Sequence, residues 1–315
     1  MNWFEAYKDQ LTEVFTESER IISKFPAPLD RLGLDYLAKF DASKEDSTKN
    51  YICYLLPFWM SDLTPLLPET IKKFSLANIF GMLYFFIQDD IMDSSTSEHK
   101  EKLPSGNLFY LQFLTIYRDL FPSESPFWTY YNEYVIEWSD AVTNESQANY
   151  FMNDIRMVAK KASPVKIAST GALLLSNRTQ LVSEVSRAIE HVLVTLQMLD
   201  DWADWEQDLE DASYNCLLAM LHAHLKLPLH IPLSKEVIKQ QVYVHDFVGL
   251  YAQVASTTHQ LLLNLGLQAH LPQLYAFHEY LIEKLLADGD QITKNRQVLA
   301  LGGFHNLLSK VNEQG

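Results

Sequence analysis

Glycine and cysteine are both scarce in this chain. Of its 315 residues, 10 are glycine and 2 are cysteine, Cys53 and Cys216. Two thiols exclude the disulfide framework of small secreted domains and fit a reducing compartment such as the cytosol. Strict alternation of apolar and polar residues is rare, whereas helical periodicity is frequent. The fold class that we predict is therefore all-α.

Basic charge is also in short supply. The chain has 25 lysines and arginines against 40 aspartates and glutamates, which gives a formal net charge of -15. This balance argues against nucleic acid or an anionic membrane as a major partner. It does not exclude an anionic substrate whose contact with the protein is mediated by metal ions.

Long apolar runs are missing as well. The longest run, from Phe74 to Ile87, is shorter than a membrane span and contains Asn78. The N-terminus is amphipathic and acidic, unlike a secretory signal. We therefore expect a cytoplasmic protein without stable membrane insertion. No repeat, low-complexity segment or linker is evident, so we predict a single domain over residues 1–315.

The helices expected from periodicity are separated by prolines and short polar stretches. One long stretch should be kinked at Ser163-Pro164 or at Thr170-Gly171. The expected helices cover about residues 3–24, a second segment ending near Phe40, a segment carrying Tyr51 and Tyr54, and then 69–93, 107–121, 126–143, 147–176, 179–210, 214–225, 235–265, 267–287 and 296–313.

The helix expected over 69–93 is apolar and aromatic until it ends in Asp89, Asp90 and Asp93. At helical pitch, Asp89 and Asp93 lie one turn apart on one face, and Asp90 lies about 100° round from them. Carboxylates this close repel one another, and burying them is costly unless a cation compensates. Because the ligands are oxygen atoms only, a hard divalent ion such as Mg²⁺ suits them.

A second carboxylate cluster follows the apolar part of the helix expected over 179–210. Asp200, Asp204 and Asp208 are spaced i, i+4, i+8 on one face, and Asp201 flanks them. A solvated acidic face would show the same spacing. Two DDxxD patterns in one chain, each preceded by apolar residues, nevertheless favour metal binding. The predicted metal ligands are Asp89, Asp90, Asp93, Asp200, Asp201, Asp204 and Asp208.

Both clusters resemble motifs of the class I isoprenoid synthase superfamily, which includes trans-prenyl diphosphate synthases and class I terpene cyclases. The segment 89–95 is similar to their first aspartate-rich motif. The segment 200–208 resembles their second motif, with Gln207 in place of a glycine. The segment 213–218 is similar to their TYPxLL element. The resemblance spans about residues 75–220 and implies a single helical bundle with a central active-site cavity.

The resemblance also implies a chemistry. The two motifs would hold three Mg²⁺ ions, and Asp89, Asp90 and Asp93 would be catalytic. Metal ions stabilise the charge of a departing diphosphate, and the carbocation left behind needs a dry, aromatic cavity. The substrate would be a small linear allylic prenyl diphosphate, and a homodimer is among the assemblies that we expect.

Tyr84 and Phe85 lie one helical turn before the first motif. In the prenyl synthases that the chain resembles, bulky residues at this place limit the length of the prenyl chain. This implies a short cavity and makes farnesyl diphosphate our first choice of substrate. Packing between helices is the alternative role for both side chains.

Three basic elements that bind a second diphosphate in chain-elongating synthases are missing. The region comparable to their Gly-Lys-Arg element begins at Lys49, no Arg-Arg-Gly follows the first motif, and Asp211 replaces an expected lysine. Lost cations mean a lost anion site, so the sequence favours a single-substrate terpene cyclase. The alternatives are a prenyl-chain-forming transferase and, from another class, a non-catalytic subunit of this fold that binds a partner.

Basic residues for the one remaining diphosphate are expected before the second motif. Arg156 lies 44 residues before Asp200, about where terpene cyclases often carry a diphosphate-sensing arginine. We therefore assign Arg156 to catalysis and to substrate binding. In the alternative interpretation, the lysines near Arg156 form an ordinary solvated helix face. The further candidates for substrate binding are Lys160, Lys161, Lys166 and, as a C-terminal clamp, Lys294 and Arg296.

Overall fold

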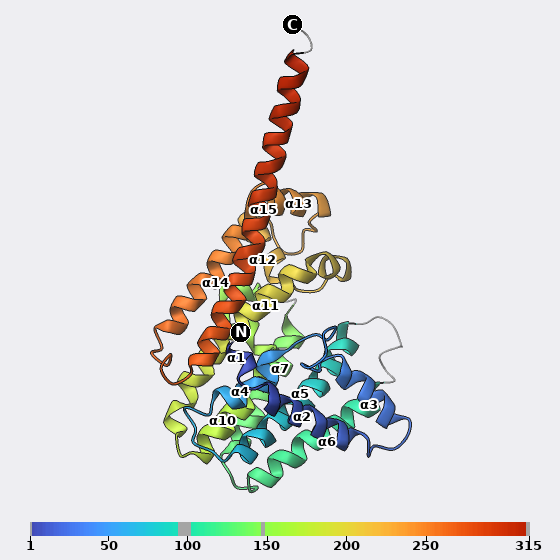
Figure 1. Cartoon of the computed structure of the whole chain (residues 1–315), viewed down its shortest axis with the longest axis vertical. Helices are drawn as coiled ribbons and strands as arrows, with labels where there is room; N and C mark the ends of the chain where they lie inside the picture. The colour runs from blue at the N-terminus through green and yellow to red at the C-terminus, as the bar shows by residue number, and fades with distance from the viewer. Residues whose placement is uncertain (1, 94–101, 146–148, 313–315) are drawn as a thin grey trace. The chain divides into compact units, whose positions relative to one another are not determined.

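A computed structural model describes residues 2–93, 102–145 and 149–312, with side chains described for 3–92, 102–145 and 149–299. Within these ranges every regular element is a helix and none is a strand (Figure 1), which confirms the all-α prediction. No helix in these ranges is both long enough and apolar enough to cross a membrane. The elements are α1 (Asn2–Glu5), α2 (Lys8–Ile22), α3 (Leu29–Ala38), α4 (Tyr51–Trp59), α5 (Pro68–Asp93), α6 (Leu103–Leu120), α7 (Phe127–Asn144), α8 (Tyr150–Asn153), α9 (Arg156–Lys160), η2 (Ser163–Val165), α10 (Lys166–Leu175), η3 (Thr179–Leu181), α11 (Val182–Asp211), α12 (Cys216–His224), α13 (Lys235–Tyr243), α14 (Phe247–Leu263) and α15 (Pro272–Asn312).

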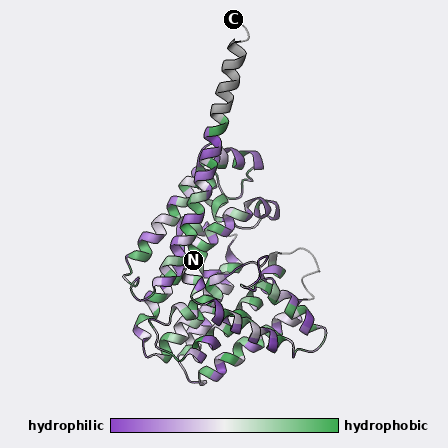
Figure 2. Cartoon of the chain, viewed as in Figure 1, coloured by the Kyte–Doolittle hydropathy of each residue, from purple (hydrophilic) through white to green (hydrophobic). Residues whose placement is uncertain are grey.

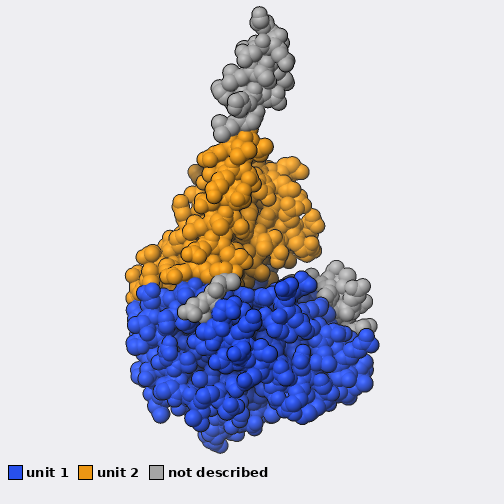
Figure 3. Space-filling view, in the orientation of Figure 1, with its two compact units in different colours: residues 1–143, 160–190, 265–277 blue, residues 144–159, 191–264, 278–315 orange. Residues whose placement is uncertain are grey.

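The chain divides into two compact units, each assembled from three separate stretches (Figure 3). The first unit contains residues 1–143, 160–190 and 265–277, and the second contains 144–159, 191–264 and 278–315. The long helices α11 and α15 begin in the first unit and continue into the second. The single domain expected over 1–315 stays a prediction.

The first unit is organised around α5, which packs against α2, α4, α6 and α10. Many of its side chains are completely buried, including Phe80 and Leu83. A helix that is apolar on most sides can keep its side chains away from water only inside a core. Gly81 allows a close approach here, because a Cβ atom at this position would lie 2.8 Å from the ring of Phe113 on α6. Most other helices carry both hydrophobic and hydrophilic residues (Figure 2), as amphipathic helices do.

The second unit is held together by apolar contacts and by a buried polar network. The side-chain hydroxyl of Tyr251 on α14 donates to the carbonyl of Met198 on α11 at 3.1 Å. His278 on α15 is fully buried, and its Nε2 lies 2.6 Å from the hydroxyl of Thr195. Its Nδ1 lies 3.0 Å from Nδ1 of His259. Burial, together with the charges of neighbouring histidines, lowers the pKa of His278 to about 3, so its ring is neutral near neutral pH.

Several predicted helix boundaries are wrong, for local reasons. The stretch 147–176 is broken into α8, α9, η2 and α10, since Asp154 is extended and Pro164 lacks an N–H donor. The helix predicted over 235–265 is interrupted at Asp246, which adopts a left-handed conformation with φ 59°. In contrast, α4 continues through Pro57, and α15 is one continuous helix where two were expected.

Candidate active site

The first carboxylate motif lies at the C-terminal end of α5, in the first unit. Asp89 is exposed and Asp90 is partly buried. Oδ2 of Asp90 accepts a bond from the Lys102 ammonium at 2.7 Å and another from the Tyr36 hydroxyl at 3.3 Å. Burial and the negative charge of Asp90 raise the pKa of Tyr36, so the phenol remains a donor. The side chain of Asp93 lies outside the described residues.

Lys102 and Tyr36 are site residues that the sequence analysis missed. Lys102 directly precedes α6 and follows the first motif by nine residues, so a basic residue close to the motif was a usable signal. Tyr36 is on α3, more than 50 residues before the motif. No local pattern marks such a distant residue as a neighbour of Asp90.

The second motif divides into residues with different surroundings. Asp200 and Asp204 are exposed on α11. Asp201, in contrast, is only 3% exposed. Its Oδ1 accepts from the Gln197 side chain at 2.7 Å, and its Oδ2 accepts from the backbone N–H of Cys216 at 2.6 Å. Asp201 thus helps to cap the start of α12, and the metal ligation that we predicted for it stays a prediction.

Asn215 joins the end of α11 to α12. Its side-chain amide donates to the carboxylate of Asp208 at 2.7 Å and to the backbone carbonyl of Asp201 at 2.7 Å. Its Oδ1 accepts from the backbone N–H of Leu218 and so caps α12 as well. Asp208 is therefore oriented by Asn215 and remains partly exposed.

The exposed carboxylates fit an oxygen-preferring ion. Asp89 at the end of α5, and Asp200 and Asp204 on one face of α11, offer the donor atoms that Mg²⁺ prefers. Among the described side chains, no group of three or more His, Cys, Asp or Glu residues is arranged to hold a metal. The first motif belongs to the first unit and the second motif to the second unit. Magnesium binding by the two motifs stays a prediction.

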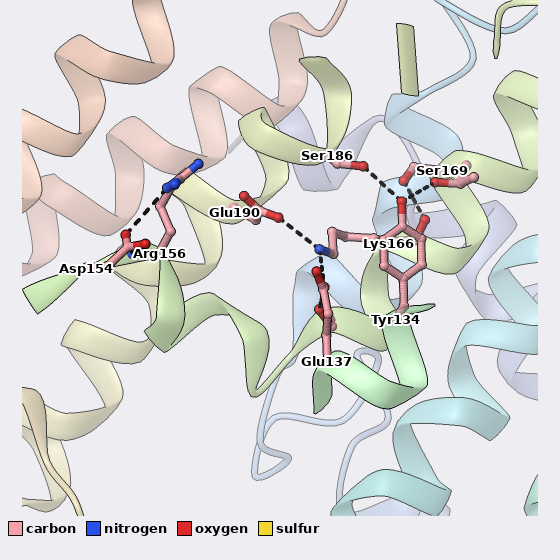
Figure 4. Close-up of polar contacts among 10 residues, drawn as sticks. Tyr134, Glu137, Asp154, Arg156, Lys166, Ser169, Ser186 and Glu190 are labelled. Atoms are coloured by element: carbon pink, nitrogen blue, oxygen red, sulfur yellow. Dashed lines mark hydrogen bonds and ion pairs between the residues drawn. The ribbon is translucent and has the colours of Figure 1, made fainter. Parts of the chain in front are cut away.

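Lys166 occupies a buried ionic cluster in the first unit (Figure 4). Its ammonium lies 2.8 Å from the Glu137 carboxylate on α7 and 2.9 Å from the Glu190 carboxylate on α11. It also lies 4.5 Å from the ring centroid of Tyr134. With a side chain only 2% exposed, Lys166 joins helices to one another. The diphosphate contact that we predicted for Lys166 stays a prediction beside this structural role.

The protonation states of this cluster follow from its pairing. Burial opposes the charged form of Lys166, but the two carboxylates outweigh it and raise the pKa of the ammonium. Burial alone would raise the pKa of Glu137, but hydrogen bonds from Lys166 and Ser163 lower it. Each charge is therefore retained because its partner is in place.

The remaining predicted basic residues are more exposed. Arg156 begins α9 and pairs with Asp154, its Nε lying 3.5 Å from Oδ1 (Figure 4). Lys160 and Lys161 are partly exposed. The structure thus assigns Arg156 to the second unit and both lysines to the first. Their contacts with a substrate stay predictions.

Arg296 stabilises a turn of the second unit. Its guanidinium donates to the carbonyl of Val244 at 3.0 Å and lies 3.7 Å from the carboxylate of Asp246. These contacts join α15 to the interruption between α13 and α14. Lys294 is exposed. These contacts do not test the diphosphate clamp predicted for Lys294 and Arg296, which stays a prediction.

Tyr84 and Phe85 both contact aromatic side chains of neighbouring helices in the first unit. The ring centroid of Phe85 lies 4.9 Å from that of Trp138, and the centroid of Tyr84 lies 4.6 Å from that of Tyr110. Phe85 is 8% exposed, whereas Tyr84 is partly exposed. Both side chains therefore pack between helices, which is the alternative role named for them. Their predicted role in limiting the length of the substrate stays a prediction.

Comparison with known proteins identifies the fold. No protein-family model and no curated protein sequence matches this chain. Its structure is similar to that of a geranylgeranyl pyrophosphate synthase from Lactobacillus brevis ATCC 367, with a TM-score of 0.70 and 16% identity over 89% of this chain and 98% of that one. A polyprenyl synthetase from Streptomyces coelicolor A3(2) gives a TM-score of 0.49 at 14% identity, over 93% of this chain and 92% of that one. The chain has the class I isoprenoid synthase fold, as the two motifs implied.

Asp201 and Asp204 should respond differently to truncation. Asp201→Ala removes two hydrogen bonds in a buried place and leaves the backbone N–H of Cys216 at the start of α12 without this acceptor, so the free energy of unfolding should fall by about 1–3 kcal/mol. Asp204→Ala removes an exposed carboxylate and should change the free energy of unfolding by less than about 0.5 kcal/mol. Urea unfolding of both variants measures this difference. Equal stability of the two variants would contradict the capping role.

Lys166→Met should destabilise the first unit by about 3 kcal/mol, because it leaves two carboxylates in low-dielectric surroundings. The pH dependence provides a second test. In wild type, the pKa of Glu137 is lower in the folded protein than its ordinary value of 4.5 in the unfolded chain. The stability that the ionised Glu137 contributes is therefore fully present above pH 4.5 and is lost as pH falls through the pKa of the folded state. Without Lys166, the lowering by its charge and its hydrogen bond is lost, so the pKa of Glu137 rises, and the variant should recover stability relative to wild type as pH falls through the raised value.

The matched control for this experiment is Lys160→Met, which removes a partly exposed lysine six residues earlier in the chain. Thermal unfolding across the pH range should show a much smaller effect for the control. If Lys166→Met and wild type differ by the same amount at every pH, Lys166 does not set the charge state of Glu137.

Proposed function

We propose that this chain is a Mg²⁺-dependent isoprenoid synthase that ionises an allylic prenyl diphosphate. The observation that carries the proposal is the pair of DDxxD motifs at helical positions in a chain with the isoprenoid synthase fold. Asp89, Asp200 and Asp204 are exposed, as carboxylates must be to meet solvated ions. A non-catalytic subunit would not need to retain both motifs.

Prenyl-chain formation is the first candidate reaction. The structural neighbour with the higher TM-score is a geranylgeranyl pyrophosphate synthase, and this favours the transferase that the sequence analysis named as an alternative. In this reaction the ionised allylic chain is joined to a second prenyl diphosphate. The first candidate therefore needs a second anion site.

Cyclisation or rearrangement of one prenyl chain is the second candidate, and the fate of Lys49 favours it. The ammonium of Lys49 donates to the backbone carbonyls of Lys44 and Glu45 at 3.0 Å each and of Ser47 at 3.3 Å. Lys49 thus stabilises its own loop in the region where chain-elongating synthases carry basic residues for the second diphosphate. A terpene cyclase does not need that site.

The chain's own residues would divide the work in either reaction. Asp89, Asp90 and Asp93 of the first motif, with Asp200, Asp204 and Asp208 of the second, would hold the metal. Bound Mg²⁺ would supply Lewis-acid stabilisation of the departing diphosphate. Aromatic rings such as those of Tyr84 and Phe85 would exclude water and stabilise positive charge on the prenyl chain.

Supplying labelled isopentenyl diphosphate together with geranyl or farnesyl diphosphate distinguishes the two candidates. A chain-forming enzyme incorporates the label into a longer diphosphate, whereas a cyclase leaves it unused and releases a hydrocarbon or an alcohol. Both reactions should stop in EDTA and resume with Mg²⁺. Asp204→Ala should lower turnover at least about 100-fold while the protein stays folded. Full turnover in EDTA would overturn the proposed function.

Phe85→Ala tests the expected limit on substrate length. If Phe85 closes the cavity, the variant should shift its preference toward substrates or products longer by about one isoprene unit. If Phe85 only packs against Trp138, the variant should lose about 3–5 kcal/mol of stability without a change in preference. Phe74→Ala, a buried position on the same helix, is the matched control for stability. Comparing substrates of increasing chain length with all three proteins provides the measurement.

A further inference from the structure

The contact between Asp90 and Lys102 places a lysine against a carboxylate that is expected to bind metal. Both residues belong to the first unit, Asp90 at the end of α5 and Lys102 just before α6. The ammonium lies 2.7 Å from Oδ2, which is the distance of a charge-assisted hydrogen bond. The same oxygen accepts from Tyr36, so the carboxylate is held by groups from two neighbouring segments.

The helical geometry turns Asp90 away from Asp89. Successive residues of a helix lie about 100° apart, so these two side chains leave α5 in different directions. Asp90 points to the side where Tyr36 and Lys102 contact it. A divalent ion that takes Oδ2 of Asp90 as a ligand needs a lone pair of this oxygen, to which the Lys102 ammonium donates a hydrogen bond. Lys102 and the ion are alternatives at this oxygen.

The strength of the pair is suited to exchange. The side chains of Lys102 and Asp90 are 29% and 36% exposed, so water screens their attraction. Such a pair is weak enough for a divalent ion to displace, yet it still opposes binding. The Tyr36 hydroxyl also donates to Asp90, so a second group still holds this carboxylate when Lys102 leaves.

We infer that Lys102 is an internal counter-ion of the first motif that competes with Mg²⁺ for Asp90 and so sets the metal affinity of this site. The inference rests on the proposed function, because it takes the first motif to be a metal site. Removal of the lysine charge should strengthen metal binding, whereas loss of a residue that merely positions Asp90 should weaken it.

Lys39 provides a matched control within the same cluster. Its ammonium lies 5.6 Å from the ring centroid of Tyr36, and that of Lys102 lies 5.4 Å from the same centroid. Lys39→Gln and Lys102→Gln therefore remove one positive charge each from the surroundings of one ring. Of these two lysines it is Lys102 that bonds to Asp90, so a general effect of net charge would appear in both variants.

The experiment is a titration of the substrate-free full chain with Mn²⁺, an ion that shares the oxygen preference of Mg²⁺ and whose unbound fraction is measured by electron paramagnetic resonance. Lys102→Gln should bind Mn²⁺ about two- to fivefold more tightly than wild type. Lys39→Gln should differ from wild type by less than about 1.5-fold. Lys102→Arg, which keeps the charge, should resemble wild type and shows whether a folded variant at this position is obtained.

Unchanged or weaker binding in Lys102→Gln would overturn the inference, as would an equal gain in Lys39→Gln. Failure of the proposed function gives a different result. In that case wild type would bind no Mn²⁺, and neither inorganic pyrophosphate nor Asp90→Asn would alter the titration. Metal binding by wild type without a response to Lys102 would leave the proposed function intact and remove only the counter-ion role.

Discussion

Repulsion between carboxylates gathered on single helices is the constraint on which the rest of this structure depends. The core helix α5 ends in an acidic motif, and α11 carries a second acidic motif, in a chain whose formal net charge is -15. Each acid must meet water, a hydrogen-bond donor, a basic side chain or a bound ion. The surroundings of each carboxylate therefore indicate its role.

Acids that meet donors from the protein have structural roles. Asp201 accepts from Gln197 and from the start of α12, and Glu137 and Glu190 enclose Lys166. These groups are already satisfied and stabilise the junctions between helices. Asp89 and Asp204, in contrast, are exposed to water, where carboxylates can meet ions from solution. Asp90 lies between these cases, because its partner Lys102 is itself partly exposed.

Aromatic packing around α5 gives the first unit a close-packed core. Gly81 admits the ring of Phe113, and Phe85 contacts Trp138 one turn further along the helix. Close-packed interiors resist deformation, so a motif at the end of such a helix is held in a defined position. The same rings would provide the dry, electron-rich surroundings that a carbocation requires.

The sequence by itself determined the helical class, the central helix over 69–93 and the two acidic motifs, since helical periodicity and i, i+4 spacing are local properties of the chain. The tertiary structure decided which acids and bases are committed to the protein. Asp201 and Asp204 lie three residues apart in one motif, yet only Asp201 meets the start of α12. The sequence made Lys166 a candidate for substrate binding, and only the fold brings Glu137 and Glu190 to it from other helices. Lys102 follows the first motif by nine residues, but its pairing with Asp90 is visible only in the folded chain, because burial and pairing depend on how the helices pack.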